Sequence, residues 1–391
     1  MLTGLFTVLV LLLLAPSFFF VVQVIVGVYR KPFILDVEDI NPSCAIIIPA
    51  HNEAQVIEKT LTQLMLSVSD NDRVIVVADN CSDDTAALAS QFNCIVLERI
   101  DLNNRGKGFA LAHGLASLSD NPPDVVVFVD ADCDADVGVI ARLKKEAMLL
   151  MAPVQATYLL TAPIEPTAKT RVSAFAIYIK NYIRPMGLSR LGGSVPITGS
   201  GFAVPYAFLA SVQLASGEIV EDMKLGIDLL LAGHKTCFSP SLCISSVLPV
   251  GDVVANVQRE RWEHGHLSMV FKYAPPLFVQ GFSQGSGTVL LTALDMCILP
   301  LTLLVTVNFC LFVVCFVLGL LGMGFLLAKL AAVALVAIFI ALTLANLLAA
   351  KAYLRMSDIF GLVNFALSKV AVYRAVLMGK KTGWVKTHRD D

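Results

Sequence analysis

The apolar positions divide the chain into membrane and soluble parts. Residues Met1–Val28 contain no charged side chain, and at about 1.5 Å per residue such a helix is long enough to cross a bilayer. A second apolar stretch runs from about Val289 to Ala350, roughly three times the ~20 residues that one crossing needs. Three glycines and a lysine interrupt it: Gly319, Gly322, Gly324 and Lys329. We therefore predict two helices there, joined by a short external turn around Gly322–Lys329.

Basic residues indicate the orientation of these segments. A cleaved signal peptide usually begins with a basic region, whereas here Arg30 and Lys31 follow the first apolar segment. Because basic residues remain cytoplasmic, we expect the amino terminus outside and the next domain inside. Three crossings return the tail to the cytoplasm. Its basic residues agree with that side: Lys380, Lys381, Lys386 and Arg389.

Between the apolar blocks, roughly Pro32–Ser286, short β-branched runs alternate with helical patterns. The predicted strands are Ala45–Ile48, Arg73–Ala78, Cys94–Leu97 and Val125–Val129. The predicted helices are Glu53–Leu66, Asp84–Gln91, Lys107–Leu118 and Val137–Met151. This alternation predicts an α/β fold with a mainly parallel sheet, whose ligands bind beyond the carboxyl ends of the strands.

Three domains follow from this pattern. We expect an N-terminal transmembrane helix at 1–29, a cytoplasmic α/β domain at 30–286, and two transmembrane helices with a basic cytoplasmic tail at 287–391. Two segments, Val172–Leu188 and Val363–Met378, mix apolar residues with Lys and Arg at helical spacing. Such segments are typical of helices that lie on a membrane surface, and ordinary core-facing helices are the alternative.

Composition supports a membrane protein and excludes other classes. Hydrophobic residues make up 56% of the chain and charged residues only 15%, less polar surface than a soluble protein needs. The balance of 29 basic and 31 acidic residues argues against nucleic-acid binding, which requires a basic excess. Nine cysteines are present without a CxxC pair, so neither a disulfide framework nor a zinc site is indicated.

An acidic pair follows the apolar run Val125–Val129. Residues two apart on a strand share a face, so we expect Asp130 and Asp132 to reach one ion. Hard oxygen ligands favour Mg²⁺ or Mn²⁺, and such an ion neutralises the charge of a departing nucleoside diphosphate. For this pair alone, solvated loop acids such as Asp134 and Asp136 are the alternative.

Two earlier positions fit a bound nucleotide. Asp79 ends the second predicted strand, where a carboxylate can accept from a base N–H or a ribose hydroxyl. Ser82 and Asp83, just beyond it, are expected to cap a helix. The segment Arg105–Leu111 is typical of a phosphate-binding turn before a helix, with Lys107 as a point charge. It lacks Walker A spacing, and an ordinary loop into a surface helix is the alternative.

Three more motifs follow in order: Thr198–Phe202 (TGSGF), Ile219–Asp222 (IVED) and Gln258–Trp262 (QRERW). With the acids above, this combination resembles the family 2 glycosyltransferases with a GT-A fold. It is most similar to the membrane-integrated branch that includes cellulose, chitin and hyaluronan synthases. The likeness covers about Ala45–His266.

The resemblance implies roles for individual residues. Asp79 matches the acid that binds the nucleotide base, Asp130 and Asp132 match the pair that holds the metal and diphosphate, and Asp222 matches the general base. The matched donor-binding positions are Pro49, Glu53, Asp79, Lys107, Asp130, Gln258 and Arg261. The matched acceptor-binding positions are Trp262, Gly199 and Ser200. Since the family inverts the anomeric carbon, an α-linked donor would give a β-linkage.

The chemistry of these residue types agrees with such roles. A carboxylate such as Asp222 helps an acceptor hydroxyl that is a poor nucleophile, and Arg261 can donate two parallel hydrogen bonds to a phosphate. The alternatives are structural: Glu221 and Asp222 could cap a helix, and Trp262 could be an anchor at the membrane surface.

The resemblance also has a departure. Only two crossings are expected after Gln258–Trp262, too few to enclose a polymer channel. This favours transfer from a nucleotide sugar, a UDP-sugar by preference, to a lipid-linked or membrane-proximal glycan acceptor, in an integral protein of a bacterial inner (plasma) membrane. A processive synthase that exports its polymer is the alternative, and an oligomer could still build a channel.

Other classes fit less well. A transporter would carry polar sites inside its membrane segments, and here only Asp295 is ionisable well within an apolar run. A catalytically inactive subunit would have lost some of the acids Asp130, Asp132 and Asp222. A sugar-nucleotidyl transferase has no need of Gln258–Trp262 beside a membrane.

Overall fold

The computed structural model describes residues 2–29, 35, 37, 40–163, 165–248, 252–349, 353–355 and 358. The chain forms two compact units, each assembled from separate stretches of sequence. The sheet unit consists of Lys31–Thr161 and Ser194–Val247. The helical unit consists of Met1–Arg30, Ala162–Gly193 and Leu248–Asp391.

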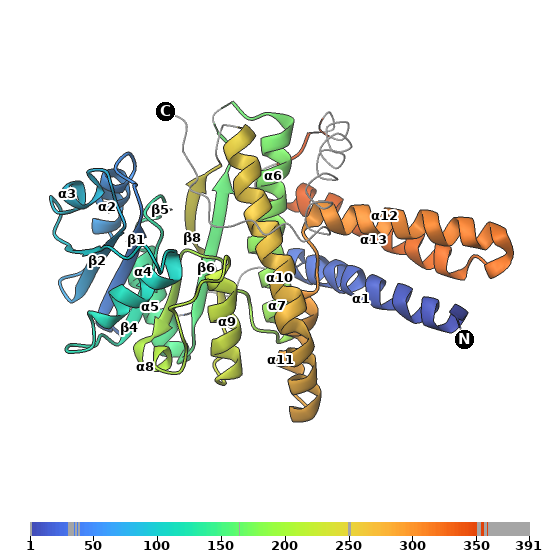
Figure 1. The fold of residues 1–391 in the computed structure, drawn as a ribbon, viewed down its shortest axis with the longest axis horizontal. Helices are drawn as coiled ribbons and strands as arrows, with labels where there is room; N and C mark the ends of the chain where they lie inside the picture. Colours follow the sequence, from blue (N-terminus) through green and yellow to red (C-terminus); the bar gives the residue numbers. More distant parts are fainter. Residues whose placement is uncertain are drawn as a thin grey trace. The chain divides into compact units, whose positions relative to one another are not determined.

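The sheet unit is built on one eight-stranded sheet with the order β3-β2-β1-β4-β7-β6-β8-β5 (Figure 1). Its strands are β1 (Cys44–Ala50), β2 (Asp72–Asp79), β3 (Ile95–Arg99), β4 (Val125–Phe128), β5 (Asp134–Ala135), β6 (Val154–Thr161), β7 (Phe202–Pro205) and β8 (Cys237–Val247). Strand β1 is parallel to β2 and β4, β2 to β3, and β6 to β8. Strand β7 is antiparallel to β4 and β6, and β5 to β8. The sheet is therefore mainly parallel, as the alternation of strands and helices predicts.

The four predicted strands are confirmed, and no strand end differs by more than two residues. Strands β1, β2 and β4 are apolar and largely buried, whereas β3 is at the edge of the sheet. Strand β1 sends Ile46 and Ile48 to one face and Ala45 and Ile47 to the other, all fully buried. Strands β5, β6, β7 and β8 were not predicted, and β5 has only two residues. Polar residues interrupt β6 and β8, and β7 is only four residues long, so no clear period marks them.

Helices cover both faces of this sheet. They are α2 (Ile57–Met65), α3 (Thr85–Ala89), α4 (Lys107–Ala116), α5 (Val139–Leu150), α8 (Tyr206–Leu209) and α9 (Glu221–Leu231). Helix α4 packs against β1 and β2, and α5 against β4 and β7. The predicted helix Glu53–Leu66 begins later than expected. The carbonyl of Glu53 accepts from the amides of Val56 and Ile57, both at 3.0 Å, so a turn precedes the helix.

The helical unit contains three helices that are long and apolar enough to cross a membrane, among the residues that the structure describes. They are α1 (Leu2–Val28), α12 (Leu301–Leu318, continued by the π-helical turn η2, Gly319–Met323) and α13 (Leu326–Leu348). Helix α13 packs against both α1 and α12 (Figure 1). The predicted break is confirmed at Gly322, which leaves the helical conformation (φ 94°). The turn is shorter than predicted, because α13 starts at Leu326 and Lys329 lies within it.

The second apolar stretch holds one element more than predicted. Its first residues form the separate short helix α11 (Gly287–Met296), which packs against the long helix α10 (Asp252–Gln284). Pro300 is the N-cap of α12 and lacks a donor to continue α11. At ~1.5 Å per residue, α11 is too short to cross a bilayer.

The segment Val172–Leu188, expected as an amphipathic helix, is helical throughout. It lies within α6 (Ala168–Tyr178), the π-helical turn η1 (Ile179–Ile183) and α7 (Arg184–Leu191). The other expected amphipathic helix, Val363–Met378, and the basic tail lie outside the described residues.

Candidate active site

Asp130 and Asp132 lie in a turn directly after β4. The amide of Cys133 donates to the carbonyl of Asp130 at 3.2 Å and closes this turn. Ligand atoms of the two carboxylates and of the Cys133 thiol lie within 4.8 Å of one another. The acids are close together, as predicted, but the expected reason was wrong. Strand β4 ends at Phe128, so a turn places the carboxylates together, and alternation along a strand does not.

These groups suit a divalent cation. The hydroxyl of Ser246, on β8, donates to Oδ2 of Asp132 at 3.1 Å and orients that carboxylate. Carboxylate oxygens are hard ligands of the kind that Mg²⁺ and Mn²⁺ prefer. Asp130 and Asp132 would therefore hold such an ion. An ion of this kind keeps several exchangeable ligands, so phosphate oxygens could bind to it as well.

Lys107 is the first residue of α4 and reaches across to this turn. Its position follows Gly106, whose φ of 125° turns the chain sharply into the helix. The ammonium forms an ion pair with Asp130 and donates to the carbonyl of Gly199 at 2.7 Å. The structure thus brings together two residues that the sequence assigned separately to phosphate and to metal.

Asp222 approaches the same place from the first turn of α9. Its Oδ1 accepts from the amide of Met223 at 2.8 Å, so the carboxylate also serves the start of the helix. Its other oxygen, Oδ2, faces Gly199, where an added Cβ would lie 3.4 Å from it. A small pocket joins these groups, lined by Lys107, Gly108, Leu111, Gly199, Phe202, Leu214, Glu221, Asp222 and Leu225.

The charges of this cluster shift one another's proton affinity. Burial by itself lowers the pKa of Lys107, but Asp130 and Glu221 outweigh it and hold that pKa above its usual range. Burial raises the pKa of Asp130, Lys107 opposes the shift, and Asp132 adds to it, with a net rise. Burial also raises the pKa of Glu221 to about 7, with Lys107 opposing and Asp222 adding to the effect. The cluster has more carboxylates than cations, an imbalance that a divalent ion would relieve.

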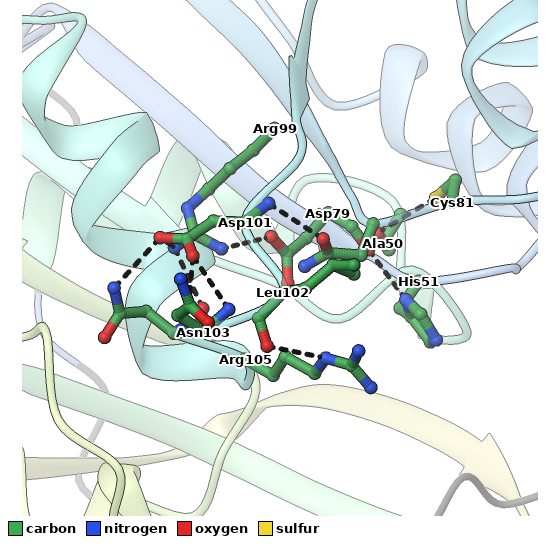
Figure 2. A network of polar contacts seen from close by, with 11 residues as sticks. Ala50, His51, Asp79, Cys81, Arg99, Asp101, Leu102, Asn103 and Arg105 are labelled. Atoms are coloured by element: carbon green, nitrogen blue, oxygen red, sulfur yellow. Dashed lines mark hydrogen bonds and ion pairs between the residues drawn. The ribbon is translucent and has the colours of Figure 1, made fainter.

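Asp79 ends β2 in a separate polar network (Figure 2). Its side chain is nearly buried, and Arg99 donates to its Oδ1 at 2.6 Å. Arg99 also donates to Asp101 at 2.9 Å, and His51 Nδ1 lies 2.7 Å from the backbone carbonyl of Asp79. Figure 2 shows Asp79 between Arg99 and His51, with the loop to Arg105 beside them. One carboxylate oxygen of Asp79 is therefore held by Arg99.

The remaining predicted donor residues of the sheet unit lie around the end of β1. Pro49 is on β1, and Glu53 is in the turn after it, where its amide donates to the Thr85 hydroxyl at 2.8 Å. Ser200, expected as an acceptor contact, is fully buried. Its hydroxyl accepts from the amide of Asp130 at 3.0 Å, so its side chain holds the start of the turn that contains Asp130 and Asp132.

The motif Gln258–Trp262 lies on α10, in the helical unit. Within the described residues, the Nε of Arg261 is buried and has no hydrogen-bond partner. A buried donor without a partner is costly, and an anionic group would satisfy it.

Two charged residues near the site were not identified from the sequence. Glu221 was considered only as a helix cap, although it lies beside Asp222. Arg99 lies just past the predicted end of a strand, and strand ends are where a parallel sheet binds its ligands. That position was the available signal for Arg99.

Residues 42–265 match the family described as "Glycosyltransferase like family 2", more than half of the chain. The protein therefore belongs to family 2 of the glycosyltransferases, with a GT-A type of sheet domain and apolar helices long enough to span a membrane.

A curated relative is also described as a glycosyltransferase. The chain is 26% identical over 251 residues to the probable glycosyltransferase YdaM of Bacillus subtilis (strain 168). This match spans 61% of the chain and 58% of the relative, so the chain covers little more than half the length of that protein.

The fold is shared with a solved structure. The mannosyltransferase PcManGT of Pyrobaculum calidifontis, in complex with GDP-Man and Mn²⁺, matches 97% of this chain and 100% of its own, with a TM-score of 0.55 and 16% identity. Glucosyl-3-phosphoglycerate synthase of Mycobacterium tuberculosis, in complex with Mn²⁺, UDP and phosphoglyceric acid, matches 61% of this chain and 84% of its own, with a TM-score of 0.41 and 20% identity.

Proposed function

We propose that this glycosyltransferase is a metal-dependent, inverting enzyme that moves a sugar from a nucleotide-diphosphate sugar to a lipid-linked or membrane-proximal glycan acceptor. The observation that carries the proposal is the meeting of Lys107, Asp130 and Asp222 around the Gly199 peptide. A cation, two acids at a turn and a third acid are the groups that sugar transfer from a diphosphate requires.

Residues at the ends of β2 and β4 would bind the donor. Asp79 would accept from the nucleotide base through the oxygen that Arg99 does not hold. Asp130 and Asp132 would hold Mg²⁺ or Mn²⁺, which neutralises the growing charge on the leaving diphosphate. Lys107 would donate to phosphate oxygens, and the resemblance assigns Arg261 a donor-binding role as well. The complex of PcManGT with GDP-Man and Mn²⁺ is consistent with this use of the fold.

The acceptor side uses Asp222. As the acceptor oxygen bonds to the anomeric carbon, the bond from that carbon to the diphosphate oxygen breaks, and the hydroxyl proton passes to Asp222. Attack opposite the leaving group inverts the carbon. Gly199 supports this site because its lack of a side chain lets an acceptor approach Asp222.

The acceptor is proposed to be attached to a lipid because three helices in the described part of the chain could cross a membrane. We place the enzyme in a bacterial plasma membrane, with the sheet unit on the cytoplasmic side, where nucleotide sugars are found. We propose a UDP-sugar as the donor. The enzyme could act as an oligomer. A processive synthase that exports its polymer is the alternative.

The test uses the full chain, purified in detergent, with a panel of UDP-, GDP- and TDP-sugars. Released nucleoside diphosphate is measured with and without a polyprenyl-linked acceptor, and the product is sized. We expect one donor to be used, release to require the acceptor, and one sugar or a short run to be added. Long polymer made without a lipid acceptor would favour the processive synthase, and no release with any donor would contradict the proposal.

Asp222→Asn provides a specific control in the same assay. This substitution keeps the size of the side chain but removes its ability to take a proton. We expect turnover to fall by about 10²- to 10⁴-fold, the usual contribution of a general base, while nucleoside diphosphate still binds. Loss of donor binding with turnover retained would instead place Asp222 in the donor site.

A further inference from the structure

Gln155 is a buried glutamine beneath the site. It lies on β6, opposite Phe202 of β7, and only 1% of its surface is exposed. A buried primary amide is costly unless both its donor and acceptor groups are satisfied. The partners of this amide therefore indicate why the core contains a glutamine at this position.

The side chain of Gln155 binds the loop that joins α7 to β7. Its Oε1 accepts from the amide of Thr198 at 3.0 Å. Its Nε2 donates to the carbonyl of Ser200 at 2.9 Å, and the carbonyl of Gly201 lies 3.3 Å away. A further contact, 2.8 Å, goes to the carbonyl of Ala156 on the same strand. One amide thus holds the loop on both sides of Gly199.

The other side of the same loop carries the catalytic groups. The carbonyl of Gly199 accepts from Lys107 at 2.7 Å, and the hydroxyl of Ser200 accepts from the Asp130 amide at 3.0 Å. The Gly199 backbone also lies against Asp222. Gly199 and Gly201 have φ values of 90° and 70°, which glycine adopts readily. Because glycine also leaves the backbone free to take other conformations, the hydrogen bonds from Gln155 restrict the loop to this one.

We infer that Gln155 is a positioning residue for sugar transfer, which sets the spacing of Lys107, Asp130 and Asp222 through the loop at Thr198–Gly201. It acts from inside the core without touching a substrate. This inference rests on the proposed function for the reaction it serves, whereas its structural part, the anchoring of the loop, does not.

The key variant is Q155E, compared with Q155M. The carboxylate of Q155E has the shape of the native amide and can accept from Thr198, but it repels the carbonyls of Ser200 and Gly201. Burial raises the pKa of such a carboxyl group, and its protonated form can again donate one hydrogen bond. The methionine of Q155M fills the space and has no strong donor at any pH.

Turnover is measured for each variant as a ratio to the native enzyme at the same pH, so that other titrating groups cancel. For Q155M we expect a ratio lower by about 10- to 100-fold at every pH, the scale of a displacement of about 1 Å in an active site. For Q155E we expect a low ratio at high pH that rises as the pH falls. Nucleoside-diphosphate binding should change much less than turnover.

A matched control is Thr157→Val. Thr157 lies two residues along β6, is buried, and its hydroxyl donates at 3.3 Å to the carbonyl of Pro240, away from the loop. This variant also loses a hydrogen bond in the core. Its turnover ratio should stay near that of the native enzyme and should not depend on pH.

A second measurement does not need turnover. Hydrogen exchange of the segment 195–203 should quicken in Q155M and remain native in T157V. Native-like turnover in Q155M, or a Q155E ratio that is independent of pH, would overturn the positioning role. If the native enzyme uses no donor at all, the proposed function fails, and unchanged exchange in Q155M would separately overturn the anchoring of the loop. Where Q155M does not fold, Q155E at two pH values compares one protein with itself.

Discussion

The ammonium of Lys107 lies against Asp130, and Glu221 and Asp222 are near enough to raise its pKa. In this state the lysine partly neutralises acids that a cation would otherwise balance. In the proposed function, a bound cation would balance the charge of the acids, and the same lysine would donate to phosphate oxygens. In this proposal, the single residue Lys107 therefore links metal binding to donor binding.

The first prediction concerns the metal. Asp132→Asn removes one charged ligand, so we expect the affinity for Mn²⁺, measured by electron paramagnetic resonance, to fall. Turnover should fall by about 100-fold or more, since a catalytic metal contributes several kcal/mol. The control is Asp134→Asn, because Asp134 lies nearby but pairs with Lys59 at 2.6 Å. Equal effects of the two substitutions, or full activity in excess chelator, would contradict a metal site at Asp132.

The second prediction concerns Glu221, whose pKa is raised from 4.5 to about 7 in the folded protein. The folded state thus holds this proton more tightly than the unfolded state does. Its contribution to the free energy of unfolding is greatest at low pH and falls as the pH rises from about 4.5 to about 7. Without metal, the melting temperature of the native protein relative to Glu221→Gln should fall between about pH 5 and about pH 8. A difference that does not depend on pH would argue against the raised pKa.

At the scale of elements, a polar cluster joins three helices of the helical unit. Asp295 on α11 accepts from Gln23 of α1 and from Arg184 of α7, both at 2.8 Å. All three side chains are buried or nearly so. Asp295 was noted from the sequence as an ionisable residue inside an apolar run, and its partners explain why it is tolerated there. The cluster ties the short helix α11 to α1.

The third prediction follows from this cluster. Asp295→Asn leaves the charge of Arg184 buried without its partner, so we expect a loss of stability of about 3–5 kcal/mol. Adding Arg184→Met should recover much of this loss, since no unpaired charge remains. The test compares the melting temperatures of the native protein and of the two variants in the same detergent. A double variant less stable than Asp295→Asn would show that Arg184 stabilises the unit independently of Asp295.

At the scale of the whole molecule, the helices that could cross a membrane are three in the described part of the chain. Three crossings by these helices would put the beginning of α1 and the end of α13 on opposite sides of the bilayer. The proposed cytoplasmic position of Arg30 and Lys31 predicts that the turn at Gly322–Phe325 faces outward and that the tail returns to the cytoplasm.

The fourth prediction tests this topology with reporters. A fusion after Asp391 should read cytoplasmic, and a reporter inserted at Gly322 should read external. Reporters on the same side would show that α12 or α13 does not cross the membrane.

The sequence by itself determined four strands of the sheet, the helices that could cross a membrane, and the residues proposed for the site. These features are local: apolar runs specify buried strands, and long apolar runs specify helices that could cross a membrane. Asp79 ends β2, and Asp130 and Asp132 follow β4 within a few residues. The break at Gly322 was equally local, because glycine readily takes the positive φ that ends a helix.

Tertiary structure alone decided how those groups are combined. Lys107 meets Gly199 across 92 residues of chain, Arg99 meets Asp79 across 20, and Gln155 meets Ser200 across 45. Such pairings depend on the order of strands and the shape of loops, neither of which is encoded in a local period. The same reason explains why β6, β7 and β8 were missed and why a turn brings Asp130 and Asp132 together. No sequence pattern around Gln155 indicates its role, because that role depends on a loop that only the folded chain places next to it.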